Sequence, residues 1–131
     1  MDVIDVVLMI AELVGLIALI YQSINLKVTI GNQIFESFVS NSLEIDRILI
    51  EYPQIRKYVY GGKPVDENTE DIDRIIAVVE MIVDISENIE VYKRYIPKNR
   101  RKGWMKFVED IKKTPSYEYY MKQCGEWYES E

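Results

Sequence analysis

The chain contains no histidine, and its 131 residues include a single cysteine, Cys124. Without histidine it lacks the usual zinc ligands, the general base of a Ser-His-Asp triad and the partner of a Cys-His nucleophile. One thiol cannot form a disulfide within the chain, so folding does not depend on an oxidising compartment. No nucleophile–base pair or organised metal cluster is evident either. We therefore expect a protein that is not an enzyme and has no catalytic residue, cofactor or bound metal.

Proline and glycine are also scarce, with four and six residues respectively. Apolar residues make up 48% of the chain, which predicts an ordered protein rather than a low-complexity one. The length suits one domain, alone or with an anchor. The formal net charge of −6 argues against nucleic acid as a partner.

Basic residues are absent before Lys27, and this stretch is the most apolar part of the chain. Residues 3–21 include twelve Leu, Ile or Val among nineteen. As a helix they would measure roughly 28 Å, which matches the hydrocarbon core of a bilayer. Their summed insertion free energy is roughly −5 kcal/mol, against a cost of about 3 kcal/mol for the central Glu12. We predict a transmembrane helix over residues 1–24 and a helical domain over residues 25–131.

Two other interpretations apply to this apolar helix. A cleaved signal peptide fits poorly, because no basic leader precedes the apolar run and no small-residue cleavage site closes it. The alternative is a long apolar helix packed in a soluble core or in a helical dimer. All sixteen basic residues follow the run, so the positive-inside rule predicts a single-pass membrane protein with its C-terminal domain in the cytoplasm.

The polar residues within this helix share one face. At 100° per residue, Asp5, Glu12 and Ser23 fall within about 20° of one another. A carboxylate in lipid normally faces protein or water. We expect these residues to line a helix–helix contact or, in an oligomer, the lumen of a narrow conduit. The alternative is that Glu12 is protonated or hydrogen-bonded to one neighbouring helix.

The rest of the chain predicts an all-α fold, with a small bundle of four to five helices after the first one. The spacing of Ile30, Ile34 and Phe38 suggests that the first helix continues past the membrane. The expected elements are a helix capped by Asn41 or Ser42 and ending near Glu51, a short helix from Pro53 to about Tyr60, a central helix from Asn68 or Thr69 to about Tyr95, and helices over 99–113 and 115–123.

Charged residues cluster at two places in this domain. Glu80, Asp84 and Glu87 lie along one side of the central helix, where carboxylates either hold a hard cation or form a solvated or ion-paired face. Seven basic residues fall within fourteen positions, from Lys93 to Lys106. The candidate contact residues of this basic segment are Lys98, Arg100, Arg101, Lys102 and Trp104.

Three uses of the basic segment are physically reasonable. It can sit against anionic head groups, at about 1 kcal/mol per basic side chain. It can bind a phosphorylated ligand or a single strand, with aromatic side chains stacking on bases. It can also pair with acidic helix faces of its own domain or of a protein partner.

Several short motifs resemble those of an uncharacterised prokaryotic family of small proteins. They are the run from Tyr52-Pro53 through Tyr58, Tyr60 and Gly62-Lys63-Pro64, the segment from Lys93 to Lys98 with Trp104, and the terminal Trp127-Tyr128. The resemblance spans most of the chain and implies an N-terminal membrane helix followed by a helical cytoplasmic domain. These motifs mark turns and helix ends, so the resemblance implies no functional residue.

Three functions follow as hypotheses. The first is a membrane-anchored helical protein that self-associates and acts as an interaction or regulatory module, with membrane lipid and further copies of itself as partners. The second is a small oligomeric ion channel or pore-forming effector with Glu12 facing the lumen. The third is a soluble helical homo-oligomer whose apolar first helix is the interface.

Overall fold

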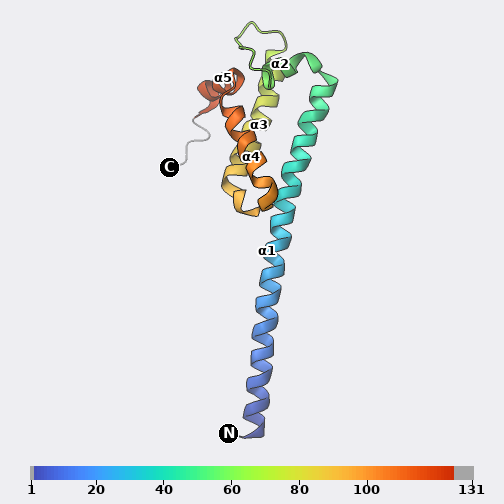
Figure 1. Ribbon diagram of the computed structural model, residues 1–131, viewed down its shortest axis with the longest axis vertical. Coiled ribbons are helices and arrows are strands. Elements are labelled where there is room, and N and C mark those ends of the chain that lie inside the picture. The colour runs from blue at the N-terminus through green and yellow to red at the C-terminus, as the bar shows by residue number, and fades with distance from the viewer. Residues whose placement is uncertain (1, 126–131) are drawn as a thin grey trace. The chain divides into compact units, whose positions relative to one another are not determined.

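The computed structural model describes residues 2–125, and these residues form helices and turns without a β-strand. The predicted all-α class is therefore confirmed. The packing divides the chain into a first unit, Met1–Ile34, and a second unit, Phe35–Glu131. The elements are α1 (Val3–Glu51), η1 (Pro53–Ile55), α2 (Arg56–Val59), α3 (Ile72–Tyr92), η2 (Lys93–Tyr95), α4 (Lys98–Lys112) and α5 (Pro115–Cys124) (Figure 1).

The first unit consists of the N-terminal part of α1. Its large apolar side chains are exposed, from Val3 at 75% to Ile30 at 39%, and none of its most apolar 18-residue window is buried. By length and composition this helix can cross a membrane.

Helix α1 runs without interruption from Val3 to Glu51. The expected separate helix capped at Asn41 or Ser42 does not exist, because the backbone stays helical through both residues. No proline occurs before Pro53, which restricts the preceding Tyr52 to a non-helical conformation at φ −125° and ψ 68°. The two packing units meet after Ile34. The predicted end of the membrane span at residue 24 stays a prediction.

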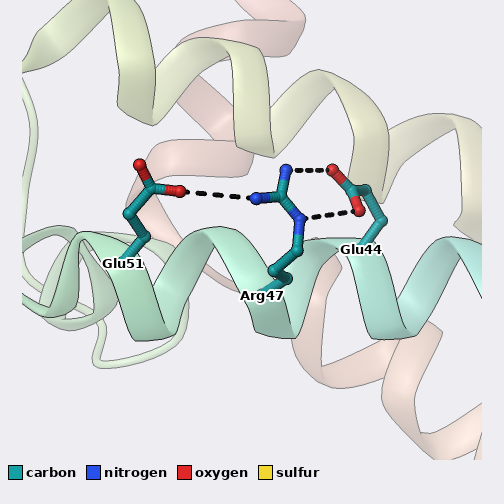
Figure 2. A network of polar contacts seen from close by, with 3 residues as sticks. All are labelled: Glu44, Arg47 and Glu51. Carbon is teal, nitrogen blue, oxygen red and sulfur yellow. Dashed lines mark hydrogen bonds and ion pairs between the residues drawn. The ribbon is translucent and has the colours of Figure 1, made fainter.

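An ion-pair network lies on the surface of α1 near its C-terminal end (Figure 2). Arg47 donates two hydrogen bonds to Glu44, at 3.0 and 2.6 Å, and one to Glu51 at 3.4 Å. The hydrogen bond from Arg47 lowers the pKa of the Glu44 carboxyl. The side chains are 46–63% exposed, so water screens these pairs and we assign them a minor contribution to stability.

The core of the second unit is built around α3, which contacts α2, η2, α4 and α5. The wide apolar face of α3 predicted that this helix lies at the centre of the bundle. Eight of its residues are buried. Phe38, Ile45 and Leu49 of α1 are also buried and occur at helical spacing, so this part of α1 contributes one apolar face to the same core.

The start of α3 differs from the prediction. The expected caps Asn68 and Thr69 lie in a turn, where the hydroxyl of Thr69 and the N–H of Asn68 are hydrogen-bonded to Asp66. Helix α3 begins three residues after Thr69, at Ile72, behind Asp71, which adopts a left-handed conformation at φ 61°. Local side-chain bonds to a turn compete with helix capping. Gln54 and Arg74 hold the Asp71 carboxylate at 2.9 and 2.6 Å.

The last two helices lie within one residue of their predicted bounds. Ile96 is buried, and the turn at Pro97 separates η2 from α4. Thr114 caps α5 by accepting a hydrogen bond from the N–H of Tyr117 at 3.3 Å, and Pro115 occupies the first helical position. The terminal Trp127-Tyr128, one of the family-like motifs, lies outside the described residues.

Candidate functional site

The first candidate site is the polar stripe of α1. Asp5, Glu12 and Ser23 are all exposed, as expected for side chains of an uncovered helix. The Asp5 carboxylate accepts a hydrogen bond from the N–H of Asp2 at 3.1 Å. Within residues 2–125, Glu12 and Ser23 have no side-chain hydrogen bond or ion pair. A single copy therefore leaves the stripe open, and whether it lines a helix contact or a lumen stays a prediction.

The second candidate site is the basic segment, which the turn between α3 and α4 holds in place. Arg101 is partly buried and donates hydrogen bonds from its guanidinium to the carbonyl oxygens of Arg94 (3.3 Å) and Ile96 (3.2 Å). These bonds tie the first turns of α4 to the preceding loop. Arg101 thus has a structural role that the sequence pattern did not distinguish from that of its neighbours.

Two other basic side chains also have partners within the chain. Lys106 pairs with Asp110 at 2.7 Å, and the guanidinium of Arg94 lies 4.8 Å from the ring centre of Tyr95. The use of the segment for internal pairing is therefore seen at these positions.

The three remaining candidate cations are unpaired. Lys98, Arg100 and Lys102 are exposed, and none has an ion pair or hydrogen bond from its side chain within the described part of the chain. Pro97 precedes α4 and provides no side-chain cap, so the positive end of the helix dipole is also open here. The structure thus concentrates free positive charge at the start of α4.

Trp104 is surrounded by aromatic rings. Its ring centre lies 6.2 Å from Phe35 and 6.3 Å from Phe38, both in α1, and 6.2 Å from Phe107 one turn further along α4. The ring centre of Phe107 in turn lies 6.4 Å from that of Tyr60, the residue that follows α2. The pairs other than Trp104–Phe38 are edge-to-face, an arrangement that adds to the burial energy of each ring. The start of α4 is therefore packed against the beginning of the second unit.

A shallow groove lies beside this aromatic row. It has a volume of about 390 Å³ and is lined by Ser42, Arg100, Gly103, Trp104 and Phe107. Arg100 is the one charged residue of the lining. A methyl group built on Gly103 would meet nothing within 4 Å, so core packing does not require glycine there. Glycine is less favourable than alanine inside a helix by about 1 kcal/mol, and nothing in the packing explains its presence here.

Of the residues that line the groove, Arg100 and Trp104 were predicted as contact residues from the sequence, whereas Ser42, Gly103 and Phe107 were not. The α1–α4 packing that brings Ser42 to α4 is not encoded in any local motif. The unexplained glycine inside a basic helix was the signal available in the sequence.

The acidic face of α3 does not form a metal site within residues 2–125, where no group of three or more acidic or thiol ligands comes together. Glu80, Asp84 and Glu87 are thus not gathered around one point. The neighbouring Glu90 pairs with Lys112 of α4 at 2.6 Å and links the two helices.

Comparisons with protein families, with curated proteins and with solved structures found no match to this chain. The resemblance drawn from the short motifs therefore stays a prediction.

Proposed function

We propose that the protein is a non-enzymatic, single-pass membrane protein that self-associates through α1 and presents its second unit in the cytoplasm as an interaction or regulatory module. The observation that carries this proposal is the uncovered apolar surface of the first unit, where none of the most apolar window is buried. Soluble monomers rarely expose a contiguous apolar surface of this extent.

Lipid is the favoured cover for this surface. The apolar side chains surround the helix on all sides, as the exposed Ile4, Val7, Leu16 and Ile17 illustrate. A dimer interface covers one stripe of a helix, whereas lipid covers its whole circumference. The free energy of membrane insertion also favours lipid. The apolar side chains contribute roughly −5 kcal/mol, and Glu12 costs about 3 kcal/mol.

Self-association follows from the polar and small residues of the same helix. Glu12 is near the middle of the proposed span, and a carboxylate there is stabilised when it faces a neighbouring helix or water. Ala11 and Gly15 are four residues apart, a spacing at which small side chains let two membrane helices approach closely. A side chain built on Gly15 would meet nothing within 4 Å, so the position is open to a partner helix.

Membrane fractionation with an alkaline carbonate wash tests the anchor, and cross-linking in mild detergent tests self-association. We expect wild-type protein to stay with the membrane and to cross-link as an oligomer. The Glu12→Leu variant should remain in the membrane but cross-link less, while Ile17→Leu, a matched change on the same helix, should behave as wild type. A protein that washes off and is monodisperse in plain buffer would instead be the soluble homo-oligomer.

A channel is the second candidate function, because Asp5, Glu12 and Ser23 project from one side of α1. Conductance across liposomes that contain the wild-type protein, and its loss in Glu12→Leu, would support a lumen at this face. An oligomer that conducts no ions leaves the interaction module as the function.

A further inference from the structure

The strongest unassigned feature of the second unit is the groove between α1 and α4 whose one charged lining residue is Arg100. Its volume of about 390 Å³ is within the range of small-molecule sites in proteins. We infer that the groove binds a small carboxylate that carries a planar apolar group, such as an aryl acid. The inference goes beyond the proposed function and does not depend on the membrane anchor, because all five lining residues belong to the second unit.

Arg100 provides the group that binds the anion. Its side chain is exposed, and within residues 2–125 it has no ion pair and no hydrogen bond. No acidic residue lines the groove. A guanidinium binds a carboxylate through two parallel hydrogen bonds, which fix the orientation of the ligand and add binding energy. The unpaired charge of Arg100 therefore favours an anionic ligand.

The aromatic part of the groove lies on the same face of α4 as Arg100. Arg100, Gly103, Trp104 and Phe107 have the spacing i, i+3, i+4 and i+7, which is that of one side of a helix. The rings of Trp104 and Phe107 meet at 75° with their centres 6.2 Å apart. A planar apolar group can pack on such a pair in an offset-stacked or edge-to-face arrangement.

The distance along α4 fits a short ligand. Arg100 and Trp104 are one turn apart, and four residues of α-helix rise about 6 Å. A spacer of two carbon atoms places a carboxylate at roughly this distance from the centre of an aromatic ring. One ligand can therefore contact the guanidinium and the aromatic pair together.

The other two lining residues leave room for a ligand and offer it a hydrogen bond. Ser42 reaches the groove from α1, and its hydroxyl has no hydrogen bond within the part of the chain that the structure describes. This hydroxyl can donate to a carboxylate oxygen. At Gly103 a Cβ would meet nothing within 4 Å, so no contact within the second unit uses this position.

A phosphate ester and a protein partner are the competing occupants. A phosphate monoester carries about −1.5 to −2 charges at pH 7, whereas the lining provides one cation, which matches the single charge of a carboxylate. A protein interface uses about 20–30 residues on each side, and this groove has five. The charge and the size of the groove therefore favour a small monocarboxylate.

Fluorine NMR of a small ligand tests the inference on the full chain in nanodiscs of neutral phosphatidylcholine. The probe is para-fluorophenylpropionate, and para-fluorophenylpropionamide is its uncharged match. We expect the protein to broaden the resonance of the acid at concentrations on the order of 1 mM, because a shallow groove buries only part of a ligand. Broadening of the amide should be at least about fivefold weaker, because the amide cannot form charge-assisted hydrogen bonds with Arg100. Empty nanodiscs give the background for both.

Substitution of Arg100 tests the anion contact. Arg100→Gln should weaken binding of the acid by about tenfold, and Arg100→Lys by less, because lysine keeps the charge but loses the parallel hydrogen bonds. Lys98→Gln removes one positive charge at an exposed position of α4 outside the lining, and it should bind the acid as wild type does.

Substitution of Gly103 tests the space in the groove. Gly103→Leu should abolish binding, because its side chain would take up the volume of the ligand. It should not unfold the protein, since a Cβ there meets no atom within 4 Å and leucine is the better helix former. Asn99→Leu, at an exposed position of α4 outside the lining, should bind as wild type. The circular dichroism of the helices reports whether each variant folds.

The outcomes separate this inference from the proposed function. Equal broadening of the acid and the amide, or unchanged binding by Arg100→Gln, would overturn the assignment of an anionic ligand. Phenyl phosphate that binds tenfold more tightly than the acid would reassign the groove to phosphate esters. Folded wild-type protein that broadens neither probe would refute the site and leave the anchor intact. A chain that stays soluble without nanodiscs would refute the anchor, and the same titration in plain buffer would still test the groove.

Discussion

At the scale of single residues, Tyr60 gives the clearest link between burial and chemistry. Its ring packs against Phe107, and desolvation by burial, together with the nearby charge of Asp46, raises the pKa of its hydroxyl to about 12 from 10.0. Between these two values the unfolded chain releases the proton while the folded chain keeps it. The contribution of Tyr60 to the free energy of unfolding is therefore fully present below pH 10. It decreases as the pH rises toward 12.

The test is the free energy of urea unfolding in detergent, measured across this alkaline range. We expect Tyr60→Phe to lose stability less steeply than wild type as the pH rises. Tyr58→Phe, a neighbouring change in α2, should keep the wild-type slope. Equal slopes for all three proteins would contradict the assignment of this pH dependence to Tyr60.

At the scale of the element, α1 changes its role along its length while remaining one helix. Ile45 is 1% exposed in the core of the second unit, whereas Ile50, in the same helix, is 79% exposed. Removing a buried isoleucine side chain to the β-carbon costs about 2–5 kcal/mol, because it loses transfer free energy and leaves a cavity.

We therefore expect Ile45→Ala to destabilise the second unit by about 2–5 kcal/mol. Ile50→Ala should change stability by less than about 0.5 kcal/mol, as a surface substitution does. Chemical unfolding followed by the circular dichroism of the helices measures both. Similar losses for the two variants would show that this part of α1 does not pack as described.

The helices that sequence analysis located best are those with strong local signals. Pro53, Pro97 and Pro115 fix the starts or boundaries of their elements because proline restricts its own and the preceding backbone. The cap at Asn41 or Ser42 was wrong because a polar residue caps a helix only where the backbone leaves the helical region, and nothing forces it to do so there. The prediction that Thr69 caps α3 was wrong for a related reason. Its side chain is hydrogen-bonded to Asp66 within the preceding turn.

The sequence predicts which segment is rich in basic residues, but it does not predict how their side chains are arranged. The density of lysine and arginine between Lys93 and Lys106 identified the segment. The division between Arg101, which holds the turn, and Arg100, which stays free, depends on where the carbonyls of the preceding loop lie. That information is tertiary and has no counterpart in the local sequence.

At the scale of the whole molecule, the two units have opposite surface character. The first exposes apolar side chains along its helix, and the second buries an apolar core under a charged exterior. A chain of this kind is expected where two solvents meet, with lipid around the first unit and water around the second. The proposed anchor and the self-association at Glu12 both depend on this division.

The environment of Ile17 tests the division most directly. This residue is 59% exposed and lies about 140° around the helix from Glu12, away from the proposed helix contact. A spin label attached through Ile17→Cys, in a Cys124→Ser background and in liposomes, reports collisions with lipid-soluble oxygen and with a water-soluble nickel complex. If lipid surrounds the first unit, we expect frequent collisions with oxygen and few with nickel. Frequent nickel collisions, or shielding from both reagents as in a protein interface, would contradict it.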